Sequence, residues 1–171
     1  KSLSMQHPAS ISAMLDDFYP DEDPWLCIAK DIFGNEIKRK SEWQAMDLSG
    51  YEFLLANPLI DNSSRKADNI LEERYLVYES DQLGKNWDLH AACILNLSKM
   101  VTCVCSHYSG SKSCHALFRV SGYSRQHIEA FKERALKLGG DPATLKPQQF
   151  CRLPMGWRKD TNQPQAILYY G

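Results

Sequence analysis

The order of apolar runs and amphipathic stretches after residue 74 constrains the fold of this chain more than any other feature. Short runs rich in apolar and β-branched residues predict strands, and apolar residues three and four positions apart predict helices. Strands are expected at residues 75–79, 101–106 and 113–120, helices at 86–100 and 124–138, and further strands at 150–153 and 166–170.

This β-α-β-β-α-β order predicts an α+β protein with a ferredoxin-like, or RRM-like, core. In that topology the first and third strands lie side by side and antiparallel in the middle of the sheet. The end of the first strand, the start of the third strand and the end of the second helix then meet at one edge of the sheet. Residues far apart in the sequence are therefore expected to be neighbours there.

The first third of the chain predicts a smaller α/β extension. Ser10 is followed by apolar residues at spacings i, i+3, i+4 and i+7, which indicates a short capped helix. Residues 25–29 and 52–56 have the apolar character of strands. We therefore expect two parts, an N-terminal extension (residues 1–55) packed on a core (residues 56–171).

The composition is that of a soluble globular protein, with 43% apolar and 24% charged residues among 171. No apolar run approaches the ~20 residues that span a bilayer, and the first residues do not resemble a secretion signal. We therefore expect a cytoplasmic protein with no membrane partner. The net charge of −1 argues against a strongly basic nucleic-acid coat protein, but it leaves room for an enzyme that contacts a strand through one local patch.

Six cysteines raise the question of disulfides or zinc. They form no C-x-x-C pair and no regular framework, which favours free, mostly buried thiols in a reducing compartment. One alternative stays open, because alternation along a strand would place Cys103, Cys105 and His107 on one face. Structural zinc sites more often present their ligands from turns.

Three polar motifs fall where this fold would bring distant segments together. Glu79 and Asp81 follow the first core strand, and Ser113 and His115 open the third. Asp141 follows the Gly-Gly pair that ends the second helix. Alternation along a strand also puts the two members of each pair on a common face. The sequence therefore predicts that all five side chains meet at one edge of the sheet.

The residue types at this edge point to nucleotidyl transfer. The three carboxylates of Glu79, Asp81 and Asp141 provide the oxygen ligands that Mg²⁺ and Mn²⁺ prefer. A histidine beside arginines suits the phosphates of a nucleotide, because the arginine fork binds phosphate oxygens in pairs. The candidate phosphate-binding residues are Lys112, Ser113, His115, Arg152 and Arg158.

Four motifs in this order resemble the archaeo-eukaryotic primase superfamily, in particular the primase-polymerase domains of phages and plasmids. The motifs read LVYESD at residues 76–81, SGSKSCHA at 109–116, LGGDP at 138–142 and CRLPMGWR at 151–158. Asn57, Pro58 and Arg65 also fit that branch, and the resemblance covers residues 56–171. The chain departs from the family's pattern twice. Glu79 stands where the first motif often has Asp, and Met155 stands where a glycine often follows Pro.

The resemblance implies a template-directed DNA primase or polymerase with a two-metal mechanism. Glu79, Asp81 and Asp141 would hold two Mg²⁺ or Mn²⁺ ions, and the candidate phosphate-binding residues would hold the incoming NTP or dNTP. The implied partners are a single-stranded DNA template and a primer strand. Members of the family often carry a helicase or a C-terminal primase domain beside this one.

Two other functions fit parts of the pattern. A ferredoxin-like sheet also serves non-catalytic single-stranded nucleic-acid-binding modules, although their glycine- and aromatic-rich central strand is missing here. A metal-dependent nuclease would use the same carboxylates and needs no triphosphate clamp. Taken one at a time, the residues also have structural explanations. Strand-end carboxylates are often only solvated, a histidine in an apolar strand is often a core residue, and Asp before Pro is common in turns.

Overall fold

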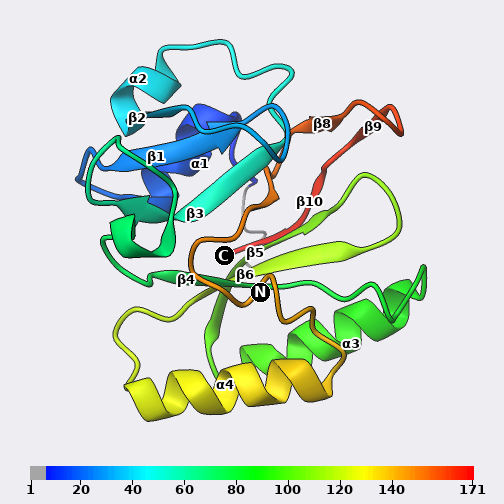
Figure 1. Cartoon of the computed structure of the whole chain (residues 1–171). Helices are drawn as coiled ribbons and strands as arrows, with labels where there is room; N and C mark the ends of the chain where they lie inside the picture. Colours follow the sequence, from blue (N-terminus) through cyan, green and yellow to red (C-terminus); the bar gives the residue numbers. More distant parts are fainter. Residues whose placement is uncertain (1–6) are drawn as a thin grey trace, which may run out of the picture.

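The computed structural model describes residues 7–171 as an α+β protein, and over these residues it has four α-helices and three antiparallel sheets. Residues 1–6 of the predicted N-terminal extension lie outside the described part. Within that part, no helix is long and apolar enough to cross a membrane. Figure 1 shows two halves, with one sheet and two helices above and another sheet with two helices beneath it.

The lower sheet carries most of the strands predicted for the core. In spatial order its strands are β10 (Ile167–Tyr170), β5 (Thr102–Tyr108), β6 (Cys114–Arg119) and β4 (Tyr75–Tyr78). Helices α3 (Trp87–Ser98) and α4 (Arg125–Lys137) cover its lower face in Figure 1. Its upper face points toward the other half of the molecule, while Leu168 and Tyr169 of β10 remain exposed.

The upper half contains the second four-stranded sheet, which has α1 (Ile11–Phe18) and α2 (Lys40–Gln44) beside it. In spatial order its strands are β2 (Ile37–Arg39), β1 (Trp25–Ala29), β3 (Phe53–Leu59) and β7 (Cys151–Arg152). A two-stranded sheet of β8 (Trp157–Arg158) and β9 (Gln163–Pro164) and a 3-10 helix, η1 (Ala67–Asn69), complete the described elements. β2, α2, β8 and β9 were not expected from the sequence, because two to five residues show no clear periodicity.

The predicted helices form where their caps and apolar stripes place them. Ser10 accepts a hydrogen bond on its side chain from the backbone N–H of Ala13 and begins α1. Ser124 does the same for His127 and begins α4, whose stripe of Ile128, Phe131 and Ala135 is buried. Each such cap satisfies a backbone donor that the helix itself leaves free.

The two halves share one hydrophobic core. Leu15 and Phe18 of α1 pack in the same cluster as Tyr75 of β4 and Leu117 of β6. The hydroxyl of Tyr75 donates to the carbonyl of Phe18 at 2.6 Å, and β3 spans the boundary predicted at residue 55. The N-terminal segment is therefore built into the same core as the segment that follows it.

The central strand pairing agrees with the predicted order, but the fourth strand does not take the ferredoxin-like place. β4 pairs antiparallel with β6, and β6 with β5, so the first and third core strands are neighbours. A ferredoxin-like fourth strand would lie beside β4. Instead β7 joins β3 in the other sheet, and β10 pairs with β5 at the opposite edge.

Asn57 of β3 takes the place of a neighbouring strand at the first residue of β4. Its side-chain oxygen accepts the backbone N–H groups of Arg74 and Tyr75, both at 2.7 Å. Its side-chain nitrogen donates to the carbonyl of Tyr75 at 3.0 Å. One buried amide therefore satisfies the backbone groups that a strand would otherwise pair.

The alternative zinc site in β5 is wrong for a local reason. A β-bulge between Cys103 and Cys105 shifts the register of β5 against β6. Cys103 consequently packs on the side of the lower helices, whereas Cys105 packs in the core shared by the two halves.

The turn expected at residues 107–112 also starts later, because β5 continues to Tyr108. All six cysteines are free and buried, as the simpler interpretation predicted.

Candidate active site

The first acidic pair lies at the end of β4. The register pairs Tyr78 with Ala116 of β6, so Glu79 comes next to the position of His115 on the neighbouring strand. Glu79 is buried, whereas the side chain of Asp81 is 62% exposed. The backbone therefore brings the first two motifs, which contain Glu79 and His115, to one end of the β4–β6 pair, as the sequence predicted.

Asp141 reaches the same place through the glycine pair after α4. Its backbone N–H donates to the carbonyl of Glu79 at 2.7 Å. A Cβ atom on Gly140 would lie 2.7 Å from the carbonyl oxygen of Ala135 and 3.2 Å from the ring of Tyr78, so only glycine fits this approach. We call Glu79, Asp81 and Asp141 the acidic rim.

The acidic rim carries more negative charge than its surroundings balance. Burial, and then the neighbouring carboxylates of Asp81 and Asp141, raise the pKa of Glu79 to about 7. The one cation that contacts the rim among the described residues is Lys112, whose Nζ is 3.9 Å from Oδ1 of Asp81 and whose side chain is 57% exposed. Asp141 is held by its own turn, because its Oδ1 accepts the N–H of Ala143 at 2.9 Å.

The rim offers the ligand atoms that divalent cations bind, but its carboxylates are not arranged as a complete metal site. Over residues 7–171, no group of three or more His, Cys, Asp and Glu side chains is arranged to hold a metal ion. The three carboxylates share one edge without converging on one point. They nevertheless offer only hard oxygen donors in a region of excess negative charge, which is the chemistry that Mg²⁺ and Mn²⁺ require.

His115 and two arginines face the rim from the other side, and we call His115, Arg152 and Arg158 the basic wall. His115 is buried on β6, and its Nδ1 lies 3.5 Å from the backbone N–H of Arg152. Burial and the neighbouring His107, Arg152 and Arg158 hold the pKa of His115 well below its usual range. The ring is therefore neutral, and because Nδ1 faces a donor, Nε2 carries the proton and can donate it in a hydrogen bond.

Arg152 is fixed by contacts on several sides. Its guanidinium lies over the ring of Phe53, 4.3 Å from the centroid, and its Nη1 donates to Oε1 of Gln165 at 3.5 Å. Oε2 of the buried Glu52 is 3.9 Å from the same nitrogen. Burial and Arg158 lower the pKa of Arg152, although an arginine keeps its charge throughout the ordinary pH range. The guanidinium is therefore a pre-oriented positive group.

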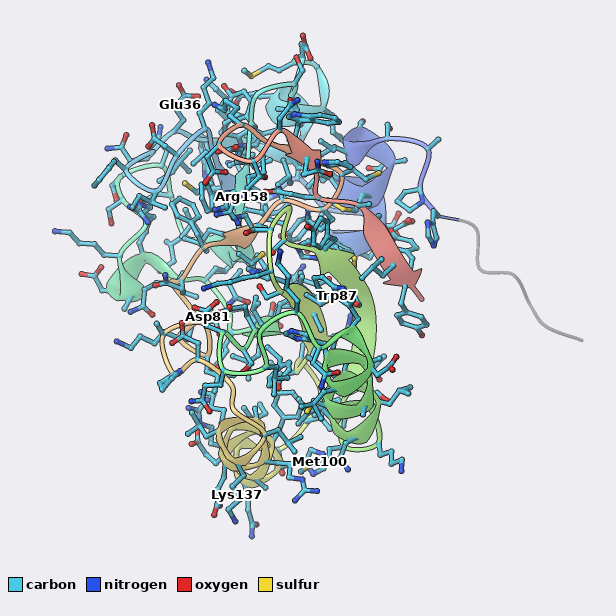
Figure 2. The ribbon with its side chains drawn as sticks, turned by 90° about the vertical axis from the view of Figure 1, so that its right-hand side faces the viewer. Glu36, Asp81, Trp87, Met100, Lys137 and Arg158 are labelled. Carbon is cyan, nitrogen blue, oxygen red and sulfur yellow. The ribbon has the colours of Figure 1, made fainter. Side chains whose placement is uncertain are left out.

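Arg158 holds the turn that carries the Ser-x-His motif. Its Nη1 donates to the carbonyl of Ser109 at 3.3 Å, while its Nε donates to Asp160 at 2.7 Å. A Cβ atom on Gly110 would lie 2.7 Å from the Cβ of Arg158, so this glycine allows the close approach. Within the turn, the backbone N–H of Ser113 donates to Oγ of Ser109 at 3.2 Å. Figure 2 shows Arg158 above Asp81 on the same side of the molecule.

Sequence reasoning missed two buried polar residues around the basic wall, Glu52 and Gln165, and considered a third, His107, only as a zinc ligand. Glu52 and Gln165 brace Arg152, and Gln165 also donates to the carbonyls of Glu52 and Leu153. His107 lies beside His115, with ring centroids 5.4 Å apart, and neither of its ring nitrogens has a hydrogen-bond partner. The signal in the sequence was weak, since each is a single polar residue next to an apolar run.

No family model, curated protein or solved structure matches this chain. The site is therefore interpreted from its own residues. All eight predicted site residues lie around the end of the β4–β6 pair, with the acidic rim on one side and the basic wall on the other. Lys112, predicted to bind phosphate, lies with its Nζ 3.9 Å from Oδ1 of Asp81.

Proposed function

We propose that this chain is a nucleotidyl-transfer domain that extends a nucleic-acid strand on a single-stranded template, as a DNA primase or DNA polymerase of the phage and plasmid type. The observation that carries the proposal is the juxtaposition of the acidic rim with the basic wall. A nucleoside triphosphate bound with divalent cations presents both charges at once, and it would neutralise both sides of this site.

The residues of the rim and the wall would then have separate tasks. Glu79, Asp81 and Asp141 would hold the cations, which supply activation of the attacking hydroxyl and charge neutralisation at the phosphates. Arg152 and Arg158 would bind the triphosphate, Arg152 from a position already fixed by its neighbours. His115 would donate a hydrogen bond from Nε2 to a phosphate oxygen, as a neutral group. Ser113 would position the turn.

Two features of the fold support the resemblance to primase-polymerases. The β-α-β-β-α order from β4 to α4, with β4 beside β6, is the part of a ferredoxin-like core that would carry the first three motifs. The second feature is Met155, which has a φ of 68°. This left-handed conformation favours glycine, the residue that the family pattern often has there.

The basic wall also discriminates between the proposed activity and its rivals. A nuclease needs the carboxylates but no set of groups for a triphosphate. A binding module of the RRM type would stack bases on exposed aromatic residues of its central strands. The aromatic residue of β6, Phe118, is instead buried against Phe131 of α4. The transferase therefore accounts for more of the observed side chains.

Primer extension tests the proposal. A labelled primer on a single-stranded template is incubated with Mg²⁺ or Mn²⁺ and with either nucleotide pool. We expect metal-dependent extension by the wild type, none by Asp81→Ala, and normal extension by Glu133→Ala. Glu133 is a matched acidic control because it is exposed on α4 and pairs only with Lys137. Absence of synthesis by the wild type with every metal and pool, or full activity of Asp81→Ala, would contradict the proposal.

A further inference from the structure

The loop between β1 and β2 presents an aromatic ring to solvent. Phe33 is 83% exposed, the highest value among the large apolar side chains of residues 7–171. The neighbouring Ile32 is 56% exposed. Burying a side chain of this size would contribute about 1.5–3 kcal/mol to stability, so its exposure needs an explanation.

The loop is not loose. The carboxylate of Asp31 accepts the backbone N–H of Phe33 at 2.8 Å, and the N–H of Gly34 donates to the carbonyl of Asp31 at 3.2 Å. A Cβ atom on Gly34 would lie 2.6 Å from the Cβ of Ala29, so the loop is packed tightly against β1. Nη2 of Arg65 donates to the carbonyl of Ile32 at 2.8 Å. Phe33 is therefore presented by an ordered loop.

A row of stacked side chains connects this loop with the basic wall. The guanidinium of Arg65 lies over the ring of Phe150 at 4.3 Å, and Phe150 packs on Phe53 with ring centroids 5.8 Å apart. Phe53 in turn lies under the guanidinium of Arg152 at 4.3 Å. We call Arg152, Phe53, Phe150, Arg65 and Phe33 the stacked row. Phe53 and Phe150 are buried within it, and Phe33 joins its end through the hydrogen bond from Arg65 to the carbonyl of Ile32. In Figure 2, Glu36 at the end of the loop, Arg158 and Asp81 follow one another down one side of the molecule.

Charged groups of both signs lie around the row, with Asp61 and Asp68 exposed in the segment that carries Arg65. Lys30 and Lys66 are exposed beside the loop and beside Arg65 in the chain. Two acids also lie in the loop, but the carboxylate of Asp31 is engaged by the N–H of Phe33, and Glu36 accepts the hydroxyl of Tyr51 at 3.2 Å. The row therefore combines arginine planes with an exposed ring, as surfaces that bind single strands do.

We propose that the single-stranded template lies over the exposed end of the stacked row, with Phe33 stacking on a base and Arg65 contacting the backbone phosphates. This inference rests on the proposed function for the identity of the strand, but it is independent of the chemistry at the acidic rim. The row leads the strand from Phe33 toward Arg152, where the incoming nucleotide would be bound.

Fluorescence anisotropy of a labelled single-stranded oligonucleotide, without metal or nucleotide, tests the surface. Loss of a base stack is worth ~1–3 kcal/mol, so Phe33→Ala should raise Kd by about 5- to 150-fold. Phe33→Tyr should bind nearly as the wild type does. Arg65→Gln should weaken binding to all sequences and reduce the salt dependence by about one phosphate contact. Tyr169→Ala is the control, since Tyr169 is 45% exposed but belongs to β10 in the other sheet.

Unchanged binding by both Phe33→Ala and Arg65→Gln, with the same melting temperature as the wild type, would overturn this surface. Equal affinity for a blunt duplex would do so too, because paired bases are not free to stack on Phe33. Primer extension by the wild type, measured beside strand binding, separates the two proposals. Strand binding through Phe33 without any synthesis by the wild type would leave the surface standing and remove the proposed activity. Synthesis with strand binding indifferent to Phe33 would do the reverse.

Discussion

The acidic rim and the basic wall are two sides of one site, and their titrating groups are perturbed in opposite directions. On the rim, burial and two neighbouring carboxylates raise the pKa of Glu79. On the wall, burial, His107 and two arginines lower the pKa of His115. Each side brings groups of like charge together, although Asp160 pairs with Arg158 and Glu52 lies 3.9 Å from Arg152 on the wall. A triphosphate with its cations is a ligand that relieves both.

The two sides also differ in how many contacts hold their charged side chains in place. Arg152 is braced by Phe53, Glu52 and Gln165, whereas Asp81 is largely exposed and contacts only Lys112 at 3.9 Å. Changes on the rim should therefore remove activity without loss of stability. Changes on the wall should affect the nucleotide complex and, for the buried groups, the fold itself.

The largest expected effect is that of Asp81→Asn on synthesis. Removing one carboxylate that would hold the cations should lower kcat/KM on the order of 10³-fold. Each tenfold loss corresponds to about 1.4 kcal/mol of transition-state stabilisation. Thermal unfolding should stay unchanged or shift upward, because Glu79 loses a like-charged neighbour. A large fall in the melting temperature would contradict the division between rim and wall.

Arg152→Lys should come next. Lysine keeps the charge but lacks the planar fork that stacks on Phe53 and binds phosphate oxygens in pairs. We expect the KM for the nucleotide to rise by about 10- to 100-fold, as for the loss of a charged hydrogen bond, with a smaller change in kcat. Arg125→Lys on the surface of α4 is the matched control, and equal effects of the two substitutions would argue against a phosphate-binding role for Arg152.

Glu52→Gln should have a smaller effect on the KM for the nucleotide, because Glu52 acts only by holding Arg152. The amide still accepts the backbone N–H of Lys159 but no longer attracts the guanidinium. The expected rise in KM is about 3- to 10-fold, as for a coupling of roughly 1 kcal/mol. In an Arg152→Lys background the same substitution should have less effect. Simple additivity of the two changes would show that Glu52 acts elsewhere.

His107→Leu should change stability on the side of the wall. Both ring nitrogens of His107 are buried without partners, so an apolar residue of similar size should raise the unfolding free energy by about 1–3 kcal/mol. Burial lowers the pKa of His107 to about 4 from its ordinary 6.5. The unfolded chain therefore binds the proton first, and stability is complete above pH 6.5 and falls as the pH drops toward 4.

His107→Leu should consequently weaken the loss of stability between these two pH values. The neighbouring His115, whose pKa is also lowered, gives the unfolding free energy a pH dependence of the same sign. The slope of unfolding free energy against pH should therefore become smaller but not zero. Chemical denaturation at a series of pH values measures this directly. A steeper loss in the variant would mean that His107 is protonated in the folded protein.

Local patterns predicted the elements of this fold well and its long-range arrangement only in part. Ser10 and Ser124 mark their helices because a cap depends on three or four neighbouring residues. The pairing of β4 with β6 follows from the order of elements. The place of the last strands does not, because it depends on contacts between the two sheets, such as those of Asn57 with the start of β4. The bulge at Cys103 and Cys105 is likewise invisible to a rule of alternation.

The candidate site shows the same limit. Its charged residues could be identified from their order, because the fold brings the ends of known elements together. The groups that brace Arg152 could not, since Glu52 and Gln165 are 113 positions apart and meet only through the packing of β7 and the β8–β9 region. The contact of Lys112 with Asp81 likewise depends on where the turn before β6 lies relative to the end of β4.

The most direct test of the account is whether the rim and the wall bind one ligand together. Isothermal titration calorimetry would measure the affinity for a nucleoside triphosphate with and without Mn²⁺, and the affinity for Mn²⁺ with and without the nucleotide. We expect each to strengthen the other by about tenfold or more, equally in both directions, as linkage requires. Asp81→Asn should abolish the coupling. Triphosphate binding of the same strength with and without Mn²⁺ would contradict the central claim.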